Sequence, residues 1–170
     1  MAYTYLLFQR KRGKDYGTGN GFMGSVVAQG AGTIDTVYSD AIITGDKLVY
    51  GGIVGYVQKD ATIRNCWYSG QITLGTKGGW VGGITGRITG GCTTTLEHCL
   101  VTGIISSEYK DVPSVGGVCG IIDAKDTNVT IADTLSAGSV ITPTTAGVGS
   151  LLGYLNTGSN LTIRDTYVTL

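Results

Sequence analysis

Four cysteines and one histidine are the residues of this chain whose chemistry could support metal binding or nucleophilic catalysis. Cys92, His98 and Cys99 are close in sequence, but a Cys-x6-Cys spacing is not a zinc knuckle and a single histidine leaves the ligand set short. His98 also lacks a serine or cysteine nucleophile with an evident third member, so a catalytic triad is not supported. We therefore expect no metal, no cofactor and no enzymatic activity.

The elements that must position these residues belong to an internal repeat. Glycine-rich tetrads (GFMG, GIVG, GITG, GVCG and SLLG) end at Gly24, Gly55, Gly86, Gly120 and Gly153, with spacings of 31, 31, 34 and 33 residues. A second block follows each tetrad and begins at Thr33, Thr62, Thr95, Thr130 and Thr162. Each of these threonines precedes Ile or Leu, and a large residue recurs four positions after that, at Tyr38, Trp67, Leu100, Leu135 and Tyr167. A period of about 20 to 50 residues indicates a solenoid, a propeller or an array.

Short β-branched runs bounded by glycine, without a helical period, predict strands of about 4 to 6 residues. One unit offers about five inward apolar side chains, which at roughly 1.5 to 3 kcal/mol each cannot offset the ordering of about 30 residues. The units must therefore stack. We predict an all-β parallel β-solenoid (β-helix) of about five coils of 31–34 residues. Residues 1–20 would form an N-terminal strand and basic turn, and the repeats would span 21–50, 51–81, 82–115, 116–148 and 149–170.

The second copy carries the clearest family signature, with GIVG at 52–55 followed by TIRNCWYSG at 62–70. This pattern resembles the GLUG motif repeat, in which Gly-Leu-x-Gly precedes Ile-x-Asn-Cys/Ser-Tyr-Ser/Thr-x-Gly-x-Val. The resemblance covers about residues 21–170, with departures at Thr85, Cys119, Ser150 and His98. Proteins of this kind are mostly large, repetitive surface or secreted proteins, including adhesin-like ones, and no catalytic residue belongs to the repeat. The resemblance implies a structural or adhesive module at the cell surface or outside the cell.

Aligned copies place Cys66 and Cys99 at equivalent positions, on adjacent rungs about 4.8 Å apart. Buried thiols, a disulfide and a metal site all remain open for this pair. The position just before it holds Thr36, Asn65, His98, Asp133 and Asp165. Carboxylates on neighbouring rungs could do acid/base work in a carbohydrate-active β-helix. Asp and Asn at one repeated position are more typical of turns, in which their side chains bond to nearby backbone.

The repeated threonine has no exception among the five copies, and a flat threonine array can bind ice. The position two residues later holds Asp35, Arg64, Glu97, Ala132 and Arg164, whose charges of both signs would disturb such a face. We therefore interpret the threonines as a β-branched ladder on an outward strand face. Ice binding is the weaker alternative.

Aromatic residues outside the repeated blocks could hold a glycan. Trp80 and Tyr56 are the candidate contacts, and Tyr154 is a further exposed candidate. Two Asn-x-Thr sequons, at Asn128 and Asn160, fall at equivalent positions of adjacent copies and matter only in a eukaryotic secretory pathway.

Charge and hydropathy exclude two classes of partner. The net charge is zero and basic residues cluster only at positions 10–14, which does not predict nucleic-acid binding. No apolar run reaches the 18 or so residues of a membrane span.

The ends of the chain suggest self-association. Residues 1–8 are predicted to form a strand that belongs to the end of a coil, and the last copy stops before its final strand. The first strand of one molecule would then complete the last coil of the next, giving head-to-tail filaments. The predicted interface residues are Tyr3, Tyr5, Leu7, Tyr167 and Leu170. Neighbouring repeats of a longer chain could fill the same role.

Overall fold

The computed structural model describes residues 7–9, 12–14, 21–46, 48–76, 79–111, 114–143 and 146–169. These residues form 22 β-strands and no helix. The strands are β1 (Leu7–Gln9), β2 (Arg12–Lys14), β3 (Phe22–Gly24), β4 (Val27–Ser39), β5 (Ile42–Gly45), β6 (Val49–Gly51), β7 (Val54–Tyr68), β8 (Gln71–Leu74), β9 (Trp80–Gly82), β10 (Thr85–Ile88), β11 (Thr93–Glu97), β12 (Leu100–Val101), β13 (Ile104–Ser107), β14 (Ser114–Gly116), β15 (Cys119–Ile122), β16 (Asn128–Ala132), β17 (Leu135–Ser136), β18 (Ser139–Ile141), β19 (Val148–Gly149), β20 (Leu152–Leu155), β21 (Asn160–Arg164) and β22 (Tyr167–Val168).

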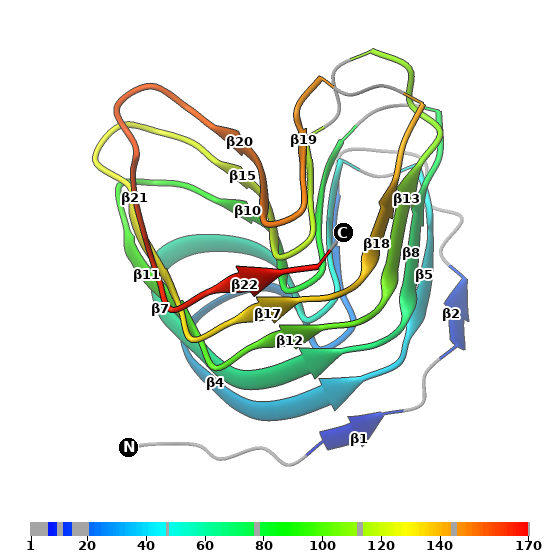
Figure 1. Cartoon of the computed structure of the whole chain (residues 1–170), viewed down its shortest axis with the longest axis horizontal. Coiled ribbons are helices and arrows are strands. Elements are labelled where there is room, and N and C mark those ends of the chain that lie inside the picture. Colours follow the sequence, from blue (N-terminus) through cyan, green and yellow to red (C-terminus); the bar gives the residue numbers. More distant parts are fainter. Residues whose placement is uncertain are drawn as a thin grey trace.

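The strands stack in parallel into three sheets that wind around one core (Figure 1). Sheet A has twelve strands and includes β4, β7, β10, β11, β12 and their equivalents above. Sheet B has the order β18-β13-β8-β5-β2, and sheet C has the order β19-β14-β9-β6-β3. Each coil runs from sheet C through sheet A to sheet B. The predicted parallel β-solenoid is therefore confirmed.

The solenoid has about four turns, slightly fewer than the five coils expected from the repeat. Sheet C contains five strands, so four complete turns separate β3 from β19. The fifth copy contributes β20, β21 and β22, but no later strand of sheet B follows β22 within the described residues. Five sequence copies therefore build about four closed turns.

The glycines of the four later tetrads lie where each coil folds inward between sheets C and A, as at the β19–β20 turn in Figure 1. The predicted alignment of GFMG with them is wrong, because Gly24 pairs with Gly51 and not with Gly55. A Cβ atom on Gly86 would lie 2.5 Å from the carbonyl oxygen of Tyr50, and one on Gly120 would lie 2.5 Å from that of Gly86. Both distances are shorter than real Cβ contacts allow. The tetrads therefore permit a close approach of two chain segments.

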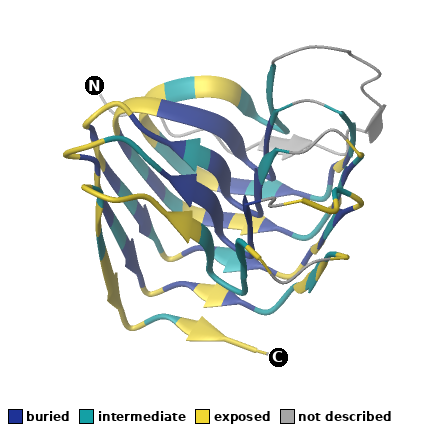
Figure 2. Ribbon diagram, turned by 90° about the horizontal axis from the view of Figure 1, so that it is seen from above, coloured by how far each residue is buried: buried dark blue, intermediate teal, exposed yellow. Residues whose placement is uncertain are grey.

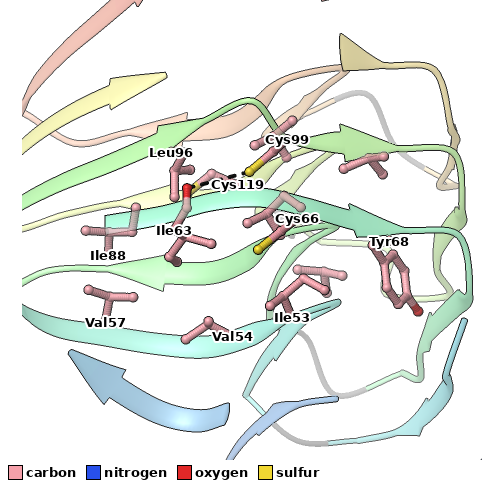
Figure 3. Packing of buried hydrophobic residues seen from close by; sticks show 14 of the residues in the cluster. Ile53, Val54, Val57, Ile63, Cys66, Tyr68, Ile88, Leu96, Cys99 and Cys119 are labelled. Atoms are coloured by element: carbon pink, nitrogen blue, oxygen red, sulfur yellow. Dashed lines mark hydrogen bonds between the residues drawn. The ribbon is translucent and has the colours of Figure 1, made fainter. Parts of the chain in front are cut away.

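Stacked aliphatic side chains fill the interior of the coil and form the core, part of which is drawn in Figure 3. Ile63, Leu96 and Ile131 pair in register on adjacent rungs, and each is fully buried. The column of large residues that includes Trp67 and Leu135 points outward instead, and these two residues are 42% and 37% exposed. Its neighbours Cys66 and Tyr68 face the core. The in/out alternation is reversed by a left-handed residue two positions before this column, at Asn65 and Asp133.

Candidate functional site

A left-handed residue interrupts the same strand in every copy. Thr36, Asn65, His98, Asp133 and Asp165 have φ values of 56°, 53°, 51°, 48° and 47°. Asn and Asp tolerate this backbone conformation better than most residues with a Cβ atom. The single left-handed residue shifts the in/out alternation of the strand by one position, which puts Trp67 outside and Cys66 inside. These residues therefore shape a turn, as predicted, but they do so through backbone conformation, because the side chains of Thr36 and Asn65 donate to the Asp35 carboxylate rather than bonding to nearby backbone.

Asp133, one of the carboxylates on neighbouring rungs considered for acid/base chemistry, has a histidine and an arginine side chain nearby. Its Oδ2 atom is 4.0 Å from His98 Nε2 and 3.7 Å from Arg164 Nη1. All three side chains are substantially exposed, with 37% for Asp133. Exposed ion pairs of this kind contribute about 0 to 1 kcal/mol.

In four of the five copies, the side chain of the residue after the left-handed position donates a hydrogen bond back to the carbonyl oxygen two residues earlier. Cys66 Sγ donates to Arg64 O at 3.1 Å, and Cys99 Sγ donates to Glu97 O at 3.3 Å. Thr134 and Thr166 make the same bond through Oγ1, at 2.8 Å and 2.9 Å. In this column either a thiol or a hydroxyl donates the hydrogen bond that closes the turn on its buried side.

Cys66 and Cys99 are free, buried thiols, so the structure has the thiol state and not the disulfide among the alternatives left open (Figure 3). Interaction with the neighbouring thiol lowers the pKa of Cys66, whereas that same interaction and burial raise the pKa of Cys99 well above its usual value. Cys92 and Cys119 are also free and buried. Burial raises the pKa of Cys119, which packs in the core.

The five threonines form an unbroken ladder on sheet A, from Thr33 through Thr62, Thr95 and Thr130 to Thr162. They are exposed or half-buried, which confirms the outward strand face. An open hollow of about 280 Å³ lies over the lower part of the ladder. It is lined by Gly32, Thr33, Asp60, Ala61, Thr62, Thr93 and Thr95.

The two sequon asparagines lie side by side on this face. Asn128 and Asn160 pair in register and are both exposed, and Asn160 Nδ2 donates to Asn128 Oδ1 at 3.0 Å.

Trp80 and Tyr56, the predicted glycan contacts, come together around one arginine. The guanidinium carbon of Arg87 lies 4.3 Å from the Trp80 ring centroid and 5.2 Å from that of Tyr56. Arg87 also makes a two-pronged ion pair with Asp123, at 3.0 and 2.8 Å. Tyr56 is only 5% exposed and stacks on Phe22 with a centroid separation of 4.3 Å. The expected exposed glycan contact at Tyr56 is therefore wrong, because its ring is already enclosed.

The aromatic side chains that do reach the surface are others. Trp67 is 42% exposed, Tyr154 is 46% exposed and Tyr167 is 71% exposed. Tyr154 was an expected exposed residue, whereas Trp67 was missed because it sits inside a repeated block. The missed signal was the left-handed Asn65, which reverses the strand alternation before Trp67.

The upper end of the solenoid is the C-terminal end, whose last rung is the lowest one in Figure 2, and it leaves its core columns uncovered. Leu155, Ile163 and Val168 are 42%, 51% and 46% exposed. The residues one rung below them are buried, at 0% for Ile122, 0% for Ile131 and 2% for Ser136. No strand pairs with the outer edge of β20, β21 or β22 among the described residues. This open end is the strongest candidate functional site.

The predicted interface residues are only partly described. Tyr167 lies in the last rung at this end, and Leu7 lies in β1, whereas Tyr3, Tyr5 and Leu170 lie outside the described residues. β1 pairs with Val37–Ser39 of its own β4, one rung below. Through β4, β7, β12 and β17, this column leads to β22. β1 and β22 therefore occupy equivalent places at opposite ends of one stack.

Fold and surface together define a parallel β-solenoid repeat protein whose coils continue the same columns from rung to rung. No protein-family model, curated protein or solved structure matches the chain. The described residues contain no helix of the length and apolarity that crossing a membrane requires.

Proposed function

We propose that this protein is a non-enzymatic structural or adhesive repeat module, located at the cell surface or outside the cell, that assembles end to end through its solenoid ends. The likeness of its tetrads and TIRNCWYSG block to the GLUG motif repeat supports this setting. A solenoid with an uncovered end exposes both a row of unpaired backbone groups and the cross-section of its core. Either a second molecule or further repeats can cover such an end.

The exposure of Ile163 is the observation that carries the proposal. Ile34, Ile63, Leu96 and Ile131 precede it in the same column, and the last three are fully buried. Ile163 is 51% exposed only because no rung lies above it in the described residues. Burying a large aliphatic side chain contributes roughly 1.5 to 3 kcal/mol. Covering the end therefore provides a substantial apolar gain.

Sedimentation velocity and negative-stain microscopy over a range of concentrations test the proposal. We expect the parent chain to form longer species as concentration rises, and Ile163→Lys to remain short because the charge would be buried at the junction. Thr162→Lys is the matched control, since Thr162 is the neighbour of Ile163 on the same rung and its side chain faces outward. A parent chain that stays monomeric at every concentration would contradict end-to-end assembly, as would equal behaviour of the two variants.

Glycan binding is the second candidate, and the position of Trp67 favours it. The indole is 42% exposed, lies 4.8 Å from the Tyr38 ring centroid and donates from Nε1 to Thr102 Oγ1 at 2.8 Å. An exposed aromatic ring that is held in place suits the apolar face of a sugar.

A glycan array tests this second candidate. Binding that Trp67→Ala removes and Trp80→Phe retains would support it, because Trp80 is half-buried against Arg87. Binding that Trp80→Phe removes, or no binding at all, would reject the Trp67 surface.

A further inference from the structure

We infer that the partner of the open upper end is the lower end of a second copy of this chain, stacked so that its β4 covers β20, β21 and β22, and that β1 occupies part of this junction until it is displaced. This inference rests on the proposed function. It adds the identity of the partner, the register of the junction and a strand that competes with assembly.

The repeat supplies the register. Within its strands, sheet A pairs in register with the rung below, as in Thr130 with Thr162 and Ile131 with Ile163, apart from a register shift between Gly30 and Gly32 of β4. The lower strand β4 has the same columns, with Thr33 and Ile34 at these positions. Thr36 and Asp165 are both left-handed, so the two ends also share the turn. The upper edge of the last rung therefore offers backbone groups in the phase that the lower edge of β4 requires.

Charges along one outward column continue across this junction with alternating sign. The column reads Asp35, Arg64, Glu97, Ala132 and Arg164. Asp35 and Arg64 already form an ion pair across one rung, with 2.8 Å between Nε and Oδ2. Head-to-tail stacking places Arg164 one rung from Asp35 of the second copy, which repeats this pair. This added ion pair favours the head-to-tail direction.

Apolar residues at the two ends are also complementary in size. Ile163, which is 51% exposed, would lie against Ile34, which is only partly buried at the lower end. Leu155, which is 42% exposed, belongs to a column whose lowest member is Gly30. A large side chain thus meets a position without one.

β1 already occupies one part of the lower edge of β4 that a second copy would need. Its residues Leu7–Gln9 pair with the lower edge of Val37–Ser39 in β4. The same edge is the one that β22 of a second copy would need, because β22 and residues 37–39 belong to one stack. The remaining strands of the lower end, β2, β3 and the rest of β4, would in this register meet β18, β19, β20 and β21, whose outer edges pair with no strand of the described residues. β1 therefore competes with assembly, which reverses the role predicted for it from the sequence.

Charge exchange tests the register. We expect Arg164→Glu and Asp35→Arg each to weaken association about tenfold, and a 1:1 mixture of the two variants to restore it, because opposite charges then meet at every junction. Arg64→Gln is the matched control, since it breaks the internal Asp35 ion pair without changing the upper end. Association of the parent that is insensitive to Arg164 and Asp35, or a mixture no stronger than its components, would overturn this register while leaving end-to-end assembly intact.

Deletion of residues 1–10 tests the competing strand. Sedimentation should show association at about tenfold lower concentration, because the lower edge of residues 37–39 becomes available. Unchanged or lost association would overturn the role of β1. A parent chain that never associates would instead reject the proposed function itself. Circular dichroism of each variant confirms that the β-solenoid has folded.

Discussion

Cys66 and Thr134 make the same hydrogen bond two rungs apart. The thiol of Cys66 donates to Arg64 O at 3.1 Å, and the hydroxyl of Thr134 donates to Ala132 O at 2.8 Å. Both bonds close the turn around a left-handed residue, Asn65 in one copy and Asp133 in the other. The cysteines of this column therefore act as turn donors, and their chemistry as thiols is secondary to that role.

This equivalence predicts how Cys99 tolerates substitution. Cys99→Thr should keep the free energy of unfolding within about 1 kcal/mol of the parent, whereas Cys99→Ala should lose about 1 to 2 kcal/mol through a missing donor and a small cavity. Urea unfolding followed by circular dichroism measures both. If threonine is as damaging as alanine, the hydrogen bond is not what the position requires.

The left-handed turn gives a prediction at Asn65, whose φ is 53°. Asn65→Gly should leave stability nearly unchanged, while Asn65→Val should lose about 1 to 2 kcal/mol because a β-branched side chain is strained in this conformation. Thermal and urea unfolding of the two variants provide the comparison. Equal stability of the glycine and valine variants would show that the turn does not depend on backbone conformation at this residue.

Arg87 ties together two walls of the inward fold through Asp123 and Trp80. We expect Arg87→Ala to lose about 2 kcal/mol or more, since it leaves a half-buried carboxylate unpaired and removes a cation–π contact. Arg87→Lys should recover only part of this loss, because lysine lacks the planar fork. A double-mutant cycle with Asp123→Ala measures the coupling. Strict additivity of the two changes would contradict the ion pair's role.

Asp35 makes stability depend on pH. Hydrogen bonds from Asn65, Arg64 and Thr36 lower the pKa of Asp35 below its ordinary value of 3.8. A depressed pKa stabilises the folded state above the unfolded-state pKa, and this contribution is lost as pH falls through the folded-state pKa. Asp35→Asn should therefore lose less stability than the parent between pH 6 and pH 3. Urea midpoints at both pH values measure this, and parallel curves for the two proteins would exclude the contribution.

Part of the candidate site could be predicted from the sequence. The equivalence of Cys66 with Cys99, and the turn role of the Asn65 column, follow from aligned copies. The cluster of Trp80, Tyr56 and Arg87 could not be predicted, since its members come from three strands that meet only when the coil folds inward. The exposure of Ile163 was equally hidden, because its type is that of a core residue and only its place in the last rung uncovers it.

The sequence by itself determined the repeat, the parallel β-solenoid and the ladders of threonine and isoleucine, because a period of 31 to 34 residues with in-register columns can bury its apolar side chains only by stacking. Tertiary structure decided which face each column takes and where the ends lie. A left-handed backbone at Asn65 reverses the alternation and turns Trp67 outward. β1 pairs with β4 of its own chain. The sequence could not predict this partner, because a strand edge accepts any segment in the right register and only the tertiary structure decides which segment lies nearby.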